Sequence, residues 1–157
     1  MEKTNVMRIL EQHGISYTPH SYPHGKEAVD GATVARMLGQ DPECVYKTLV
    51  ARGKSGGYFV FDIPVEAELD LKKAARAVGE KAIELVHVKE LLGLTGYVRG
   101  GCSPVGMKKA FPTVFDESVN GLPSVIVSAG KIGYQIECAP ADLIGLVRAK
   151  TAPITTD

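Results

Sequence analysis

The stretch that decides the fold is VYKTLVARGKSGGYFVFDIP, Val45–Pro64. Two runs rich in β-branched and aromatic residues, VYKTLVA and YFVFDIP, flank the glycine-, serine- and lysine-rich segment RGKSGG. This pattern is typical of a β-hairpin, because the outer runs suit a pleated sheet and the middle suits a turn. We therefore expect two adjacent antiparallel strands in the middle of the fold.

The segments around this hairpin predict a mixed set of elements. Apolar residues at helical spacing, often with a capping residue or a terminal glycine, predict helices over residues 6–13, 33–38, 71–78, 88–93 and 140–150. Further strands are predicted over residues 81–87, 95–99, 113–116, 124–129 and 134–139. Because strands outnumber helices and do not alternate regularly with them, we expect an α+β fold with a mixed or antiparallel sheet.

Length and composition predict one soluble domain. The chain has 157 residues, of which 45% are hydrophobic, and we expect residues 1–157 to form a single compact domain with a loose tail over 151–157. No apolar run approaches a membrane span, and the first residues lack the features of a signal peptide, so we expect a cytoplasmic protein with no membrane partner. Eighteen basic and eighteen acidic residues give zero net charge, which argues against a protein that coats nucleic acid through bulk charge but allows a local basic patch that serves one RNA end; we expect no DNA partner.

The cysteines and histidines predict neither a metal site nor a cofactor. Cys44, Cys102 and Cys138 are far apart, and no CxxC motif occurs. His20 and His24 have no cysteine or acidic partner at ligand spacing. We expect reduced thiols and a site made of ordinary side chains and backbone.

Lys47 is the first residue that could carry chemistry. In a strand it shares a face with Val45 and Leu49, which should point at the core. A lysine there either extends to the edge of the sheet or is held in a pocket for use.

The second candidate is the loop GGCSPVGMKK, residues 100–109. Its glycines allow close backbone approach and its proline stiffens the chain, so exposed N–H groups could hold a carbonyl or an oxyanion. A plain turn would explain the glycines equally well, and the spacing is not that of a nucleotide P-loop. SAGKIG, residues 128–133, offers a hydroxyl, a glycine and a lysine at a strand end, where a hairpin turn is the simpler interpretation.

Covalent catalysis by the protein has no clear candidate. Cys102 lies in the glycine loop, but no Cys/His/Asn or Ser/His/Asp arrangement is suggested, and GxSxG is absent. A lysine, hydroxyls and backbone amides suit positioning and electrostatic stabilisation better than nucleophilic attack.

Taken together, VYKTLVA, GGCSPVGMKK and VSAGKIGYQIE resemble the YbaK/EbsC family, free-standing relatives of the editing domain of bacterial prolyl-tRNA synthetases. The resemblance extends from the N-terminal segment to Leu146 and implies a compact α+β domain with a barrel-like sheet flanked by helices. It also implies a deacylase for mischarged aminoacyl-tRNA, with Cys-tRNA(Pro) deacylases as the most similar group. In that group the cysteine thiol of the substrate attacks its own ester.

The resemblance also assigns roles to residues. Lys47 matches the strand lysine that faces the 3′ end of the tRNA, and the backbone of Gly101 matches the group that holds the aminoacyl carbonyl; these two are the catalytic candidates. Tyr22 matches the tyrosine of a stretch that borders the pocket, and Ser128 matches the serine of the SGGK-like turn, which makes both of them substrate-binding candidates. The same motifs add five further substrate-binding candidates: Thr48, Gly100, Ser103, Gly130 and Lys131.

Two departures from the family pattern leave the amino acid open. Gln135 stands where relatives tend to have a carboxylate that could hold the substrate ammonium, and Glu137 should face the other way. The segment Glu27–Ala35 also lacks an expected phenylalanine. Ala-tRNA(Pro) editing and a non-catalytic module that binds tRNA or a synthetase therefore remain alternatives. The partners implied are tRNA(Pro) and prolyl-tRNA synthetase.

Overall fold

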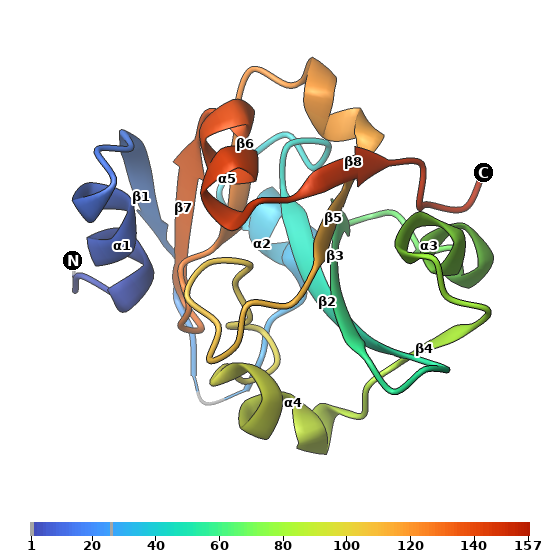
Figure 1. Cartoon of the computed structure of the whole chain (residues 1–157). Helices are drawn as coiled ribbons and strands as arrows, with labels where there is room; N and C mark the ends of the chain where they lie inside the picture. The colour runs from blue at the N-terminus through green and yellow to red at the C-terminus, as the bar shows by residue number, and fades with distance from the viewer. Residues whose placement is uncertain (1, 26) are drawn as a thin grey trace.

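The protein is described by a computed structural model covering residues 2–25 and 27–157 (Figure 1). The hairpin is formed by β2 (Tyr46–Gly53) and β3 (Tyr58–Pro64), paired antiparallel from Tyr46 opposite Pro64 to Arg52 opposite Tyr58. The central hairpin predicted from the sequence is therefore confirmed.

A five-stranded sheet grows from this hairpin in the order β4-β2-β3-β5-β8. β4 (Ile83–Leu85) joins antiparallel, whereas β5 (Thr113–Asp116) and β8 (Lys150–Ala152) add parallel neighbours, so the sheet is mixed. A second, antiparallel sheet has the order β1-β7-β6. It consists of β1 (Tyr17–Ser21), β7 (Tyr134–Cys138) and β6 (Val125–Ser128).

The two sheets meet where β6 passes the start of β2. Val45 and Ile126 form a parallel bridge, and the Ile126 N–H donates to the Cys44 carbonyl at 2.8 Å. The predicted α+β architecture is confirmed, and the strands of the described residues form two touching sheets that do not close into a barrel.

Helices flank both sheets (Figure 1). They are α1 (Asn5–Gln12), α2 (Gly31–Met37), α3 (Leu71–Val78), α4 (Val88–Thr95) and α5 (Pro140–Val147), and a 3₁₀ helix, η1, spans Glu117–Gly121. The largest core cluster joins α1 and α5 to the second sheet and includes Leu10, Phe115, Ile136 and Leu143. No helix in residues 2–25 or 27–157 is long and apolar enough to cross a membrane.

Two predictions from the sequence differ from the structure. Residues 95–99 are not a strand, because Thr95 ends α4 and Gly96 follows it in the left-handed conformation that terminates helices. The tail is not loose: Lys150–Ala152 pair with β5, and Ile154 is fully buried against Phe61 and Ile63 in the core beneath α3. A short strand of three residues has too little periodicity to be seen in the sequence.

Candidate functional site

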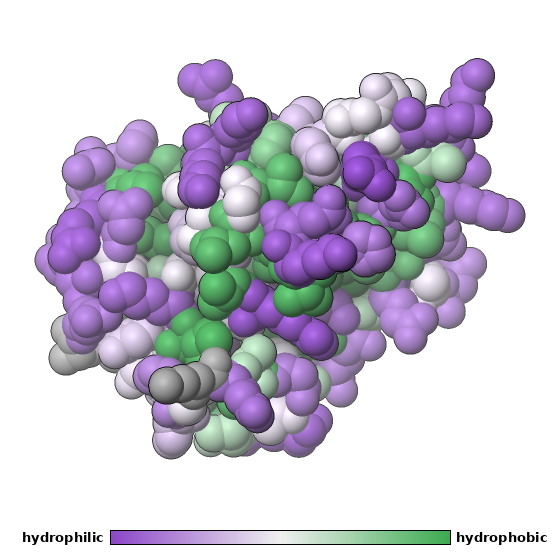
Figure 2. Space-filling model, turned by 90° about the horizontal axis from the view of Figure 1, so that it is seen from below, coloured by the Kyte–Doolittle hydropathy of each residue, from purple (hydrophilic) through white to green (hydrophobic). Residues whose placement is uncertain are grey.

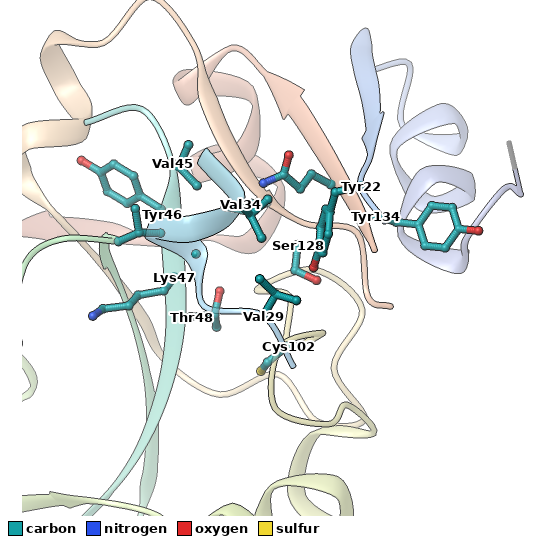
Figure 3. Close-up of a pocket in the computed structure, with 15 residues that line it drawn as sticks. Tyr22, Val29, Val34, Val45, Tyr46, Lys47, Thr48, Cys102, Ser128 and Tyr134 are labelled. Carbon is teal, nitrogen blue, oxygen red and sulfur yellow. The ribbon is translucent and has the colours of Figure 1, made fainter. Parts of the chain in front are cut away.

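A cavity lies where the two sheets meet (Figure 3). β2, the ends of β6 and β7, the segment before α2 and the glycine loop all contribute to its wall. Five of the nine predicted site residues line it: Tyr22, Lys47, Thr48, Gly100 and Ser128. Residues that are up to 106 positions apart, from Tyr22 to Ser128, are thus brought to one place.

β2 presents Lys47 and Thr48 on opposite faces of the strand, as its alternation requires. In Figure 3 the Lys47 side chain extends to one side of β2, while Thr48 points to the side where Ser128 and Cys102 lie. The Lys47 amine makes no hydrogen bond or ion pair with any described residue. An ammonium with no partner among the described residues is available to an anion, here on the side of β2 away from Ser128 and Cys102.

The glycine loop approaches the cavity through Gly100. Its φ of +87° is left-handed, and a Cβ placed there would lie 2.7 Å from Cβ of Ala28, so only glycine fits without rearrangement. The neighbouring Gly101 does not line the cavity, and its N–H already donates to the carbonyl of Val98 at 3.0 Å. The role predicted for the Gly101 backbone stays a prediction, and it would require that hydrogen bond to be exchanged for one with the substrate.

Tyr22 and Ser128 come from separate segments and lie near one another across the cavity from Thr48 (Figure 3). Ser128 ends β6, and its hydroxyl accepts a hydrogen bond from the Gly130 N–H at 3.1 Å, which shapes the following turn. The Tyr22 N–H donates to the Gly133 carbonyl at 2.9 Å, which attaches the chain after β1 to that same turn. One turn therefore positions both hydroxyl-bearing side chains.

Besides Gly101, three more predicted site residues lie outside this cavity. Ser103 is fully buried, and its hydroxyl accepts from the Val105 N–H at 3.2 Å inside the loop. Gly130 has a φ of +94° and packs against Tyr97, as a turn requires. Lys131 points outward and pairs with Glu2 at 2.6 Å. Ser103 and Gly130 thus have structural roles within the two loops, and Lys131 links its turn to the N-terminal segment.

Asp62 is a notable residue that sequence reasoning missed. It lies on β3 directly opposite Thr48 and is fully buried, and the Thr48 hydroxyl donates to its Oδ1 at 2.5 Å. Burial raises the pKa of the Asp62 carboxyl to about 8, and the Thr48 hydrogen bond opposes this only in part. The signal was present in the sequence as an acidic residue inside the apolar run FVFDIP.

Gln135 lines the cavity but is already engaged. Its Oε1 accepts from the amide of Gln40 at 2.8 Å, and its own amide lies 3.4 Å from Gln40 Oε1. Glu137 is two residues further along β7, so strand alternation places it on the same face as Gln135 and the opposite face expected from the sequence is wrong. Its carboxylate pairs with His20 at 2.7 Å and Ser124 at 2.5 Å. The cavity wall formed by described residues consequently contains no aspartate or glutamate side chain.

The Cys102 thiol lines the cavity but is poorly suited to nucleophilic attack. Burial, and next the charge of Asp62, raise the pKa of Cys102 to about 12, so the thiol is neutral at physiological pH. No histidine lines the cavity in the described part of the chain, so neither this thiol nor the Ser128 hydroxyl has an imidazole base there. The arrangement can bind, orient and polarise a substrate rather than attack it. Within the described ranges no three His, Cys, Asp or Glu side chains form a group that could hold a metal ion.

A second cavity adjoins the first and shares Thr48, Gly100 and Cys102 with it. Its remaining lining comes from β2, from α4 and from the segments before α4 and the glycine loop: Leu49, Val50, Leu85, Val86, His87, Val88, Leu91 and Arg99. Figure 2 views the molecule from the side on which α4 lies and shows hydrophobic side chains reaching the surface between hydrophilic ones. The two cavities thus adjoin, and their linings include the cationic residues Lys47 and Arg99.

Comparisons with known proteins identify the family of this chain. Residues 26–146 match the aminoacyl-tRNA editing domain family. Over 155 residues, 99% of this chain and 94% of the relative, the sequence is 45% identical to a protein of Enterococcus faecalis named "Putative Cys-tRNA(Pro)/Cys-tRNA(Cys) deacylase EbsC". A proline–tRNA ligase of Lactobacillus gasseri is 31% identical over 77 residues, which are 49% of this chain and 14% of that enzyme.

A solved structure has the same fold throughout. The crystal structure described as "a putative trans-editing enzyme for prolyl tRNA synthetase" superposes with a TM-score of 0.82 at 27% identity, covering 97% of this chain and 95% of that one. Because the family match spans most of the sequence and the Enterococcus relative is similar over nearly its whole length, this chain belongs to the aminoacyl-tRNA editing domain family.

Proposed function

We propose that this protein is a trans-editing deacylase that removes cysteine from mischarged Cys-tRNA(Pro). The observation that carries the proposal is the cavity itself, which brings Tyr22, Lys47, Thr48, Gly100 and Ser128 together without a nucleophile and base among its described residues. The name of the 45% identical relative supports the same substrate.

The chemistry suits a substrate that supplies its own nucleophile. The thiol sulfur of the cysteinyl group attacks the ester carbonyl carbon, the bond from that carbon to the ribose oxygen breaks, and the thiol proton passes to that oxygen. The products are a cyclic thiolactone, which water later opens, and free tRNA. Holding the thiol against the carbonyl lowers the entropic part of the barrier, an effect that can reach several kcal/mol in well-oriented intramolecular reactions.

The joined cavities suit the 3′ end of a tRNA. The aminoacyl group would occupy the first cavity, which is lined by both polar and apolar side chains. The terminal nucleoside would lie along the apolar wall of the second cavity, where a base can pack against Val88 and Leu91, and Lys47 and Arg99 would face phosphates. Because the net charge is zero, only a few local cations can contribute to the affinity for tRNA phosphates. We therefore expect the isolated protein to discriminate weakly between tRNAs.

This arrangement leaves tRNA selection to a partner, which we propose to be prolyl-tRNA synthetase. The similarity of this chain to segments of proline–tRNA ligases supports such a partnership. An enzyme that corrects aminoacylation is expected in the cytoplasm, where aminoacyl-tRNA is made. Strong discrimination between tRNA(Pro) and other tRNAs by the protein alone would contradict this division of labour.

The test is deacylation of Cys-tRNA(Pro), Ala-tRNA(Pro) and Ser-tRNA(Pro) by the purified protein without synthetase. Rapid loss of cysteine alone supports thiol-assisted cleavage. Equal loss of alanine, which has no nucleophilic side chain, would show that water or the protein attacks the ester and would overturn the proposed mechanism. Binding of tRNA without loss of any ester would overturn the enzyme proposal in favour of a recognition module.

A further inference from the structure

The first cavity has no acidic side chain on its described wall, although an aminoacyl ester brings a positive charge. The α-ammonium of the substrate must lose part of its hydration to enter, which is costly unless an acceptor or a negative charge replaces the water. Gln135 is the one carboxamide on the wall, and its oxygen already accepts from Gln40. The acceptor for the ammonium must therefore be sought elsewhere.

Asp62 lies directly behind the wall. Its Oδ1 is 2.5 Å from the Thr48 hydroxyl, and Thr48 lines both cavities. Its Oδ2 is the one buried side-chain polar atom of the described residues that has no hydrogen-bond partner. A fully buried carboxyl group with half of its hydrogen-bonding capacity unused is destabilising, and such groups are concentrated at functional sites.

Among the described residues, no cation lowers the pKa of Asp62, and only the hydrogen bond from the Thr48 hydroxyl opposes the effect of burial. Asp62 in turn raises the pKa of the Cys102 thiol and of the Tyr46 phenol. Burial accordingly favours the protonated acid while the cavity is empty. A cation placed against Thr48 would reverse this balance and favour the carboxylate.

The hydroxyl of Thr48 can relay this charge. When it donates its proton to Asp62, its lone pairs remain free to accept a hydrogen bond from a group in the cavity. A hydroxyl that donates to a carboxylate is also a better acceptor, because hydrogen bonds in a chain polarise one another.

We infer that Thr48 and Asp62 together form the acceptor for the α-ammonium of the aminoacyl group, with Thr48 touching the ammonium and Asp62 acting through it as a positioning residue and counter-charge. This inference rests on the proposed function, since it assigns one part of the same substrate to one part of the same site. It places recognition of the amino group on β2 and β3 rather than on Gln135 of β7.

The test uses two non-hydrolysable ligands, so that binding is measured apart from catalysis. One is 3′-cysteinylamino-3′-deoxyadenosine, in which an amide replaces the ester. The other is its 3-mercaptopropionyl counterpart, which keeps the thiol and lacks the amine. We expect the protein to bind the amine-bearing ligand about 10- to 100-fold more tightly, as for a hydrogen bond to a charged group.

Asp62→Asn should abolish this preference while leaving affinity for the amine-free ligand within about twofold of the parent protein. Thr48→Ser, which keeps a hydroxyl, should retain the preference, and Thr48→Val should lose it. The comparison of Thr48→Ser with Thr48→Val still tests the inference if Asp62→Asn lowers the stability of the fold. A parent protein without the preference, or an Asp62→Asn variant that keeps it, would overturn the inference.

Proton release gives a second readout that a merely structural role would not produce. At pH 6 the ligand amine is protonated, its ordinary pKa being about 7.7–8.0. Binding should then release a proton from Asp62, measured as a calorimetric heat that changes with the ionisation enthalpy of the buffer, and Asp62→Asn should release none. Neither measurement needs turnover, so the two proposals can fail separately. An inactive protein that still prefers the amine-bearing ligand would contradict the deacylase proposal alone. An active protein without this preference would contradict the present inference alone.

Discussion

Thr48 and Asp62 stand opposite each other in the β2–β3 pair, and their side chains are joined by a 2.5 Å hydrogen bond between a cavity and the core. Thr48 belongs to the cavity wall, whereas Asp62 is fully buried behind it. The pair therefore couples a surface that can bind a ligand to a group whose charge is controlled by burial. This coupling has consequences for stability as well as for recognition.

Stability should depend on pH through Asp62. Its pKa is raised from the ordinary 3.8 to about 8 in the folded protein, so between these values the folded state holds a proton that the unfolded state has released. The unfolded state binds fewer protons in this window, and stability from this group must fall as pH rises from about 4 to about 8. We expect Asp62→Asn to become more stable relative to the parent protein as pH rises.

The measurement is the difference in free energy of unfolding between parent and variant at pH 5, 6.5 and 8. Taking the difference removes the contributions of the other titrating groups. A difference that is constant over this range, or that moves in the opposite direction, would show that Asp62 is not buried as an acid with a raised pKa.

Loss of the Lys47 ammonium should reduce activity without unfolding the protein. The side chain is only half-buried and makes no ion pair with a described residue, so little folding energy depends on it. We expect Lys47→Ala to lower kcat/KM for Cys-tRNA(Pro) by about 10²–10³-fold, as for removal of one stabilising donor, with an unchanged melting temperature. Lys54→Ala in the β2–β3 turn is a matched control outside the cavity, and equal losses in the two variants would remove the special role of Lys47.

Much of this fold follows from local signals in the sequence. Asp70 and Gly79 bound α3 at the predicted residues, because the Asp70 side chain accepts from the Lys73 N–H and Gly79 adopts a φ of +73°. The segment before α2 was harder: the helix begins at Gly31, two residues before the prediction, since the Asp30 cap lies in a loop-like run. A capping residue therefore predicts the start of a helix well when a periodic apolar segment follows it.

The site could be predicted only in part, because its wall is made by tertiary contacts. The roles of Tyr22, Lys47 and Ser128 came from a family resemblance, and nothing in their local sequence shows that they share a cavity. Asp62 was missed because alternation along a strand says which face a side chain takes, but not whether that face is buried by another segment. Here the glycine loop covers it through Cys102, which packs with Val50 and Val60.

Cys102 should be dispensable for chemistry. Its pKa of about 12 keeps the thiol protonated, and it packs against Val50 and Val60 as a small apolar side chain. Cys102→Ala should retain kcat for deacylation within a few-fold and destabilise the fold by about 1–2 kcal/mol through the lost packing. Single-turnover deacylation and denaturant unfolding of the same sample would check both halves, and complete loss of activity in a folded variant would restore the thiol as a candidate nucleophile.

The C-terminal residues should contribute strongly to stability, contrary to what their sequence suggests. Ile154 is fully buried beside Phe61 and Ile63, its N–H donates to Asp116 at 3.1 Å, and its carbonyl accepts from the Asp70 N–H at 2.8 Å. Ile154→Ala removes buried methyl groups and leaves a cavity, so we expect a loss of about 2–5 kcal/mol in the free energy of unfolding. Thr156→Ala, which changes a less buried neighbour, should cost less than about 0.5 kcal/mol. If urea denaturation gave the two variants the same midpoint, the tail would not be part of the cooperative core. A large loss for Ile154→Ala alone would show that Ile154, two residues after β8, helps to hold α3 against the sheet that carries Thr48 and Asp62.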